Sequence, residues 1–237
     1  MSRQKKKSGG AGGGARGFYI ILAVVGLVGI AAIAYALTSG RGATATEPVE
    51  VAGIEDARTL VERAEGIVVG SADAPVKLIV FSDFMCPYCG QFALQVKPLL
   101  VQNEVAAGHL QLVAYDFPLG GTHRHSFAAA RAARCAGDQG RYWEYHDALY
   151  ARQARWSGRS STPLNDFEEY AAELGLDRAA FSACLRSDRH AEVVTANIML
   201  GERLGVRGTP TVIVNGRRVE RWGYPELSEL IKREAGV

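Results

Sequence analysis

Short apolar runs and helical repeats alternate through most of the chain. Residues 76–81 and residues 110–115 are two short, almost wholly apolar runs, a pattern typical of strands buried on both faces. Between them, apolar residues at helical spacing follow Pro87, a residue type that starts helices, and Pro98 is expected to kink that helix. The order strand, helix, strand predicts a βαβ unit with a right-handed crossover.

The next segment is mainly helical in pattern. Apolar residues recur at helical spacing over five ranges, with Asp166 and Asp177 placed as N-terminal caps. These ranges are 124–136, 142–152, 166–174, 177–185 and 189–204. The pattern predicts a block of helices at about residues 120–205.

The chain then returns to strand pattern. Strands are expected over 211–214 and 219–222, joined by a turn at Asn215-Gly216, which is a strong hairpin signal. A last amphipathic helix is expected over 225–234. Together the elements predict an α/β fold of the form βαβ…ββα, with the sheet between helices and a helical subdomain inserted midway.

The N-terminal region has a different pattern. Residues 18–37 contain no charged side chain, and twenty residues of helix at about 1.5 Å each span about 30 Å, the thickness of a bilayer core. Residues 1–17 carry five cations and no acidic residue. The sequence therefore predicts a basic cytoplasmic tail over 1–17 and one transmembrane helix over 18–37, with the rest of the chain extracytoplasmic by the positive-inside rule.

A cleaved secretory signal is the alternative to this anchor. Ala34-Tyr35-Ala36 has the small residues of a cleavage site, but the apolar run is longer than a usual signal core, which favours an uncleaved anchor. Residues 38–65 are expected to be a linker, with at most a short helix near 57–64. The catalytic domain is expected over 66–237.

Composition limits the possible functions. The 237 residues are 48% hydrophobic and 22% charged, which suits one globular domain plus a short additional segment. The net charge of +2 is too small to indicate a nucleic-acid partner. Four cysteines are too few for a disulfide-framework scaffold, so they indicate local chemistry or local cross-linking.

Cys86 and Cys89 form a CxxC motif, Cys86-Pro87-Tyr88-Cys89, where the first strand meets the following helix. Spacing i, i+3 puts both sulfurs on one helical face, close enough to bridge. The unpaired N–H groups of the first helical turn stabilise a thiolate and can lower a cysteine pKa from about 8.5 to as little as about 3.5. We therefore predict that Cys86 is a nucleophile and Cys89 its resolving partner.

Three other uses of this motif are disfavoured. A zinc site would need a second ligand pair, but Cys135 and Cys184 form no CxxC, and His123 and His125 have one intervening residue where zinc sites usually have three to five. Haem attachment would need histidine after Cys89. An inert structural disulfide between Cys86 and Cys89 would not explain why a proline stands beside Cys86 at the start of a helix. We expect no metal and no cofactor.

Five stretches of the chain together resemble the DsbA-like thiol–disulfide oxidoreductases of the thioredoxin superfamily. They are residues 70–76, 81–89, 135–146, 181–185 and 208–211, and the resemblance covers about 66–237. It implies a thioredoxin fold in which Pro210 is a cis-proline facing the CxxC motif, and in which the backbone of Thr209 hydrogen-bonds an extended substrate. A trans proline at the start of a strand is the alternative.

The resemblance also bears on the other cysteines. Cys135 and Cys184 would lie on apolar faces of neighbouring helices in an oxidising compartment, and similar family members carry a second, structural disulfide. A relay pair that passes electrons to Cys86 and Cys89 is the alternative. Asp83, three residues before Cys86, either tunes or deprotonates Cys89 or is a turn carboxylate, and the sequence leaves both open.

The reaction direction depends on Pro87 and Tyr88, which set how strongly the Cys86 thiolate is stabilised. Tyr88 replaces the histidine of the DsbA archetype, and Thr209 stands where family oxidases often have valine. We expect oxidation of exported protein thiols, with a membrane redox partner that regenerates the pair. The alternatives are an isomerase or reductase on the same scaffold, and a non-catalytic binding protein or chaperone.

Overall fold

The computed structural model describes residues 19, 24–26, 29–30 and 45–237. The chain divides into two compact units, Met1–Ala43 and Thr44–Val237. The predicted basic tail over 1–17 lies outside the described residues, as does most of the predicted membrane span, whose described positions are helical. Within the described ranges, no helix is long and apolar enough to cross a membrane. The span over 18–37 therefore stays a prediction.

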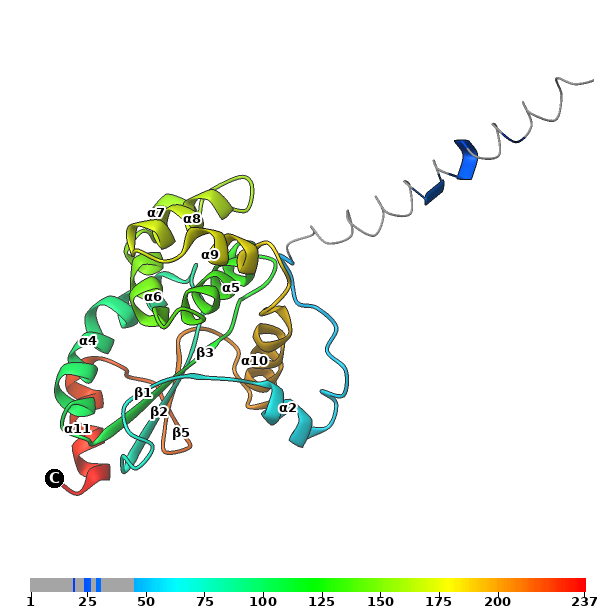
Figure 1. Ribbon diagram of the computed structural model, residues 1–237. Coiled ribbons are helices and arrows are strands. Elements are labelled where there is room, and N and C mark those ends of the chain that lie inside the picture. The colour runs from blue at the N-terminus through cyan, green and yellow to red at the C-terminus, as the bar shows by residue number, and fades with distance from the viewer. Residues whose placement is uncertain (1–18, 20–23, 27–28, 31–44) are drawn as a thin grey trace, which may run out of the picture. The chain divides into compact units, whose positions relative to one another are not determined.

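A five-stranded sheet forms the centre of the second unit (Figure 1). Its strands are β1 (Ile67–Val69), β2 (Val76–Ser82), β3 (Leu110–Asp116), β4 (Thr211–Val214) and β5 (Arg217–Val219), and their order in the sheet is β1-β3-β2-β4-β5. β2 and β3 are parallel, whereas the other neighbours are antiparallel. The predicted βαβ and ββα units are therefore confirmed. β1 was not predicted, because it has only three residues and Val68 in it is exposed.

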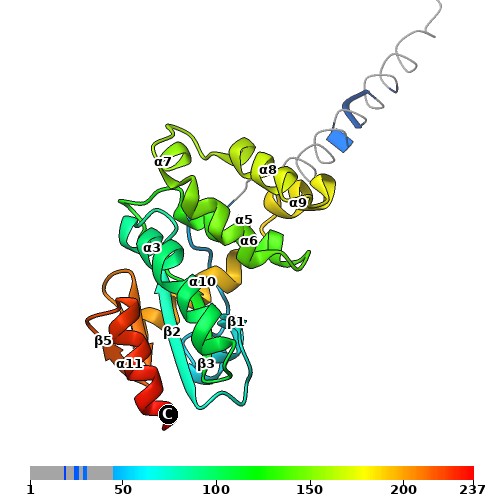
Figure 2. The same cartoon turned by 90° about the vertical axis from the view of Figure 1, so that its left-hand side faces the viewer.

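Side chains of the central strand β2 alternate between two layers, as the twofold period of a strand requires. Val76, Leu78 and Val80 pack with the crossover segment after β2 and with the C-terminal helix α11 (Tyr224–Ala235). Phe81 packs on the other face with Phe117 and with residues of helix α10 (Ala191–Arg203). Figure 2 shows α11 and α10 on opposite sides of the sheet. The CxxC motif thus follows a strand whose side chains are packed on both faces of the sheet.

The crossover from β2 to β3 is helical, as predicted, but it is not one regular helix. It consists of α3 (Pro87–Gln91), η1 (Phe92–Val96), α4 (Lys97–Leu99) and η2 (Leu100–Val105), of which η1 and η2 are π-helical. The N–H of Lys97 donates to the carbonyl of Phe92, five residues earlier. Pro98 has no N–H for the next α-helical bond, so the helix widens beside it instead of only bending.

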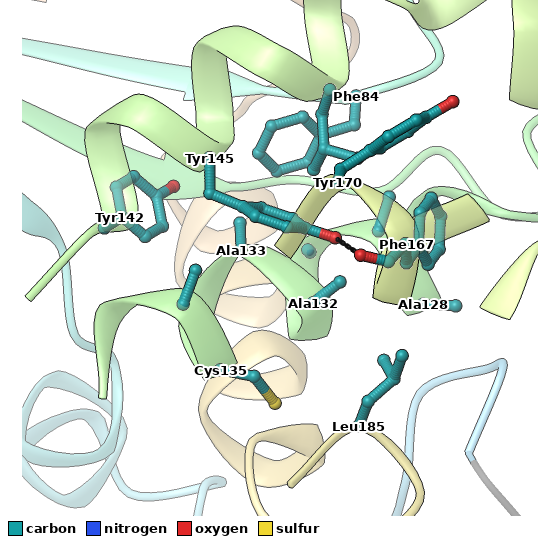
Figure 3. Packing of buried hydrophobic residues seen from close by; sticks show 14 of the residues in the cluster. Phe84, Ala128, Ala132, Ala133, Cys135, Tyr142, Tyr145, Phe167, Tyr170 and Leu185 are labelled. Carbon is teal, nitrogen blue, oxygen red and sulfur yellow. Dashed lines mark hydrogen bonds between the residues drawn. The ribbon is translucent and has the colours of Figure 1, made fainter. Parts of the chain in front are cut away.

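A helical subdomain lies between β3 and β4, as predicted (Figures 1 and 2). Its helices before α10 are α5 (Ser126–Gly137), α6 (Tyr142–Ala151), α7 (Gln153–Trp156), α8 (Leu164–Glu173) and α9 (Arg178–Leu185). All residues of α5 up to Ala136 are buried, and its many alanines allow neighbouring helices to approach closely. Tyr145 inserts its ring into this core, and its hydroxyl donates to the carbonyl of Phe167 at 2.9 Å (Figure 3).

One of the two predicted caps is correct. Asp177 caps α9 by accepting from the N–H of Ala180 at 2.9 Å. Asp166 is not a cap, because α8 begins two residues earlier, at Leu164 after Pro163. The Asp166 carboxylate lies in the first helical turn and is paired with the Arg159 guanidinium at 3.0 Å.

Two C-terminal predictions are refined by the structure. Asn215 and Gly216 have φ values of 45° and 79°, as a tight hairpin turn between β4 and β5 requires. β5 follows this turn directly at Arg217 and ends at Val219, earlier than the expected strand over 219–222. The final helix α11 buries Leu227 and Ile231 against the sheet, as its periodicity predicts.

The structure differs from the predicted linker over 38–65. Helix α2 (Ala57–Arg63) is present as expected, with Asp56 as its cap. However, Val51, Ile54 and Leu60 are buried in a cluster with Ala196 of α10, and Figure 1 shows α2 beside α10. Residues 45–65 are therefore packed on the domain. Residues 38–44 lie outside the described part of the chain.

Candidate active site

Cys86 and Cys89 lie where β2 passes into α3. Cys86 is the N-cap of α3, Pro87 is its first residue, and Cys89 lies one turn further on. Both thiols are free and buried, with 5% and 1% of the residue exposed. Tyr88, by contrast, is 61% exposed. The motif therefore has a solvent-facing tyrosine between two protected sulfurs.

The two thiols differ strongly in acidity. The pKa of Cys86 is lowered to about 5, mainly by a hydrogen bond from the Cys89 thiol and further by Thr209 and the first N–H groups of α3, against the effect of burial. The pKa of Cys89 is raised by burial and by its hydrogen bond to Cys86. At neutral pH the reduced pair is therefore a Cys86 thiolate beside a Cys89 thiol. The roles of nucleophile for Cys86 and resolving cysteine for Cys89 stay a prediction, and they are the roles that such a difference in acidity favours.

Alkylation of Cys86 in the reduced protein should follow a titration curve with a midpoint at about pH 5, because only the thiolate reacts. Folding lowers this pKa, so the thiolate stabilises the folded reduced protein. That contribution is complete above the pKa of an unfolded cysteine, about 8.5, and is lost as the pH falls through about 5. Rates of iodoacetamide labelling across pH measure the midpoint. Cys89→Ala should raise it, and an unchanged midpoint would contradict the assigned hydrogen bond.

Thr209 and Pro210 meet the CxxC motif from the other side. Their peptide bond is cis, as predicted, and lies in the loop that leads into β4. The carbonyl oxygen of Thr209 lies 3.2 Å from Cys86 Sγ and accepts a hydrogen bond from it when Cys86 is protonated. The structure thus brings Cys86 and the loop of Thr209 together across 123 residues of sequence.

Asp83 joins the CxxC motif to the loop that follows β3. Its carboxylate is buried and accepts four hydrogen bonds of 2.5–2.9 Å, from Met85 N, Leu119 N, Ser126 Oγ and His123 Nδ1. Its backbone N–H donates to Cys89 Sγ at 3.4 Å, and its carbonyl accepts from Cys86 N at 3.1 Å. These hydrogen bonds to the carboxylate are those of a structural acceptor, while the Asp83 backbone contacts both cysteines.

His123 is the imidazole partner of Asp83. The pKa of His123 is raised, first by the hydrogen bond to Asp83 and then by the negative charges of Asp83 and the Cys86 thiolate, against partial burial. The hydrogen bond to Asp83 therefore favours the protonated form of His123 beside the buried carboxylate. In the sequence this histidine was considered as a zinc ligand, for which its spacing to His125 is unsuitable.

Two further residues at the site come from the helical subdomain and were missed by sequence reasoning. Gln153 donates from its amide to the carbonyls of Phe84 and Cys86, at 2.8 and 3.0 Å. The Tyr150 hydroxyl donates to the carbonyl of Asp83 at 3.2 Å. The spacing of these two residues on α6 and α7 has no feature that points to the CxxC motif. Tyr150 and Gln153 thus fix the backbone around the CxxC motif from the side of the helical subdomain.

Cys135 and Cys184 form a disulfide that joins α5 to α9, with their Cα atoms 5.8 Å apart. The pairing implied by the family resemblance is confirmed. It spans 49 residues of sequence and connects two helices of the buried alanine-rich cluster.

Comparisons with known proteins identify relatives of this chain. Residues 62–233 match the family model described as thioredoxin. The chain is 30% identical over 169 residues to a probable disulfide bond formation protein D of Bacillus anthracis, which covers 70% of this chain and 76% of that protein. It is 36% identical over 166 residues to the Na(+)/H(+) antiporter NhaA 1 of Salinispora arenicola, which covers 70% of this chain. The match spans only 24% of the length of that antiporter.

The fold itself has close counterparts among solved structures. Oxidised BdbD from Bacillus subtilis superposes with a TM-score of 0.64 at 21% identity, covering 72% of this chain and 92% of that one. The predicted α/β thioredoxin fold with an inserted helical subdomain is therefore confirmed.

Proposed function

This chain belongs to the DsbA-like branch of the thioredoxin family, and from that premise we propose that it is a thiol–disulfide oxidoreductase that forms disulfides in exported proteins. The observation that carries the proposal is the asymmetric pair of a Cys86 thiolate and a buried Cys89 thiol at a helix start. The pair exchanges two electrons with a substrate dithiol, without a cofactor.

The reaction begins with the Cys86–Cys89 disulfide. A substrate thiolate attacks Cys86 Sγ, the bond between the two cysteines breaks, and a mixed disulfide forms between the substrate and Cys86. The Cys89 sulfur leaves as a thiolate and takes up a proton, which its raised pKa favours. The backbone of Thr209 beside Pro210 pairs with the extended substrate and aligns it with Cys86.

A second substrate thiolate then attacks the substrate sulfur of the mixed disulfide. The substrate disulfide forms, the bond to Cys86 breaks, and Cys86 leaves as a thiolate. Its low pKa makes Cys86 a good leaving group at neutral pH. The substrate has lost two electrons, which now reside on the reduced pair, and a membrane redox partner accepts them to restore the disulfide.

The low pKa of Cys86 supports oxidation as the direction. Stabilising the thiolate stabilises the reduced protein, which makes its disulfide a stronger oxidant. A pKa of about 5 lies between those of thioredoxin, about 7, and DsbA, about 3.5. Tyr88 supplies no imidazole next to Cys86, but His123 lies behind Asp83, and its pKa is raised by the hydrogen bond to Asp83 and by the negative charges of Asp83 and Cys86.

The reduction potential of the Cys86–Cys89 pair tests the direction. Equilibration of the full chain with glutathione redox buffers, followed by alkylation of free thiols, should give a value less negative than about −200 mV. A Cys135→Ala/Cys184→Ala variant measured in parallel shows that the titrating pair is Cys86 and Cys89. A value near that of thioredoxin, about −270 mV, would overturn the oxidase and favour a reductase.

The remaining parts of the proposal concern location. A structural disulfide between α5 and α9 persists in an oxidising compartment, which supports an extracytoplasmic catalytic domain. The uncharged run over 18–37 behind a basic tail supports attachment to the cell membrane by a single span with a cytoplasmic N-terminus. Reactivity of an engineered cysteine in residues 1–17 toward an impermeant thiol reagent, in whole cells against lysed cells, distinguishes the two sides.

A further inference from the structure

The Cys135–Cys184 disulfide lies where three helix ends meet. Cys135 is near the end of α5, Cys184 is near the end of α9, and His190 is the N-cap of α10. Figure 3 shows the Cys135 sulfur pointing from α5 toward the Leu185 end of α9. The two sulfurs and one ring nitrogen of His190 all lie within 4.8 Å of one another.

Asp138, the residue after the end of α5, adds a fourth donor atom to this cluster. Its Oδ2 lies 3.1 Å from His190 Nε2 and 3.5 Å from Cys184 Sγ. A disulfide sulfur has no proton, so the second contact is not a hydrogen bond in the oxidised protein. Arg189 balances the carboxylate with its Nη1 at 3.0 Å. Only after the disulfide is reduced does Cys184 carry a thiol proton that the Asp138 carboxylate can accept.

We propose that the cluster of Cys135, Cys184, Asp138 and His190 is a zinc site that opens when its disulfide is reduced. Two thiolates, an imidazole and a carboxylate are the ligand types of four-coordinate zinc. Zinc bonds of about 2.0–2.3 Å place tetrahedral ligand atoms about 3.3–3.8 Å apart, so the nitrogen and sulfurs need to move by about 1 Å. The metal takes the place of the proton between His190 Nε2 and Asp138 Oδ2.

Charge and access are compatible with a bound cation. Two thiolates and one carboxylate carry three negative charges, of which zinc neutralises two and the Arg189 guanidinium the third. His190 and Asp138 are partly exposed, with side chains 17% and 32% accessible. A surface cavity of about 340 Å³ is lined in part by these two residues and gives a path for entry.

Metal binding and the disulfide exclude each other. Reduction by a dithiol adds two electrons and two protons, breaks the S–S bond, and leaves two thiols, while the dithiol becomes a disulfide. Zinc then displaces the two thiol protons and forms two Zn–S bonds. Oxidation by a protein disulfide reverses this, because the S–S bond re-forms and zinc is released.

The zinc site would act in a newly exported chain, before the Cys135–Cys184 disulfide has formed. A newly exported chain has four free thiols, and pairing Cys86 or Cys89 with Cys135 or Cys184 would give an inactive product. Zinc at the junction of α5 and α9 holds the correct two sulfurs together and leaves the CxxC pair free. This inference does not depend on the direction of the reaction at Cys86 and Cys89.

Metal titration of the full chain tests the proposal. The background is Cys86→Ser/Cys89→Ser, which removes the other dithiol. The protein is reduced with a phosphine under argon, freed of reductant and titrated with Co²⁺, then with Zn²⁺ against a chromophoric chelator. We expect one cation per chain with a thiolate-to-cobalt absorption band in the reduced protein, and neither in the oxidised protein.

Variants identify the ligands. His190→Ala and Asp138→Asn should each weaken zinc binding about tenfold or more, whereas the control His109→Ala, in the turn before β3, should not change it. Circular dichroism of each reduced variant checks that it is folded, and zinc should raise the melting temperature only where it binds. No cobalt band in a folded reduced protein, or zinc binding that survives Cys135→Ser/Cys184→Ser, would overturn the site.

Discussion

Replacing Cys86 with alanine should slow oxidation of a peptide dithiol by about a thousandfold or more, because the reaction loses the sulfur that the substrate attacks. Cys89→Ala should fail differently. It keeps the Cys86 thiolate, which can still attack a disulfide of an exported protein: that S–S bond breaks, one substrate thiolate is released, and the other substrate sulfur becomes bonded to Cys86. No Cys89 thiol is then present to displace the substrate from Cys86. The variant should therefore accumulate mixed disulfides on Cys86, visible as reducible high-mass species on gels of membranes that carry the full chain.

The control for this trap is the Cys86→Ala/Cys89→Ala double variant, which should give no adducts while it keeps the disulfide between α5 and α9. Melting temperatures near that of the unchanged chain would show that both variants are folded. A folded Cys89→Ala protein without adducts would contradict the enzymatic proposal and favour a non-catalytic binding protein.

The elements that could be predicted from the sequence are those whose signals are local. Two apolar runs flanking a helix start predict parallel strands, and Asn215-Gly216 predicts the hairpin that the structure contains. The position of Cys86 at the N-terminus of α3 follows from Pro87 in the same way. The cis bond before Pro210 and the partner of Cys135 came from the family resemblance, because no local spacing encodes either of them.

The polar network around the CxxC motif could not be predicted from the sequence, for a different reason. The donors to Asp83 from the loop after β3 and from α5 are 36–43 residues away in sequence, and they meet it only once β2 and β3 are paired. The sequence therefore left open whether Asp83 acts on Cys89. In the structure the Asp83 carboxylate accepts hydrogen bonds from the loop after β3, and one of them brings His123 to the site.

The packed segment over 45–65 escaped prediction because its apolar positions are sparse. Val51, Ile54 and Leu60 follow no strand or helix period across the stretch, and polar residues surround them. Their burial depends on the surface of α10, where Arg203 also donates to the carbonyls of Ile54 and Glu55, at 3.0 and 2.6 Å. A segment whose order comes from a distant helix looks like a linker in the sequence.

The double substitution Cys135→Ala/Cys184→Ala should lower the free energy of unfolding by about 4 kcal/mol, the second large effect that we expect. The disulfide closes a loop of about 50 residues, and on the chain-entropy model a loop of that length stabilises the folded state by this amount. For a domain of this size the loss corresponds to about 8–16 °C in melting temperature. Urea and thermal unfolding of the purified chain measure it.

Cys86→Ala/Cys89→Ala is the matched control, because this pair closes a very short loop and its removal should cost much less. A loss below about 1 kcal/mol on removing Cys135 and Cys184 would mean that packing alone holds α5 and α9 together. The same variant also addresses the relay alternative. Since a structural disulfide affects only stability, the folded variant should oxidise dithiols at the normal rate well below its melting temperature, and a slow rate there would show that the pair passes electrons.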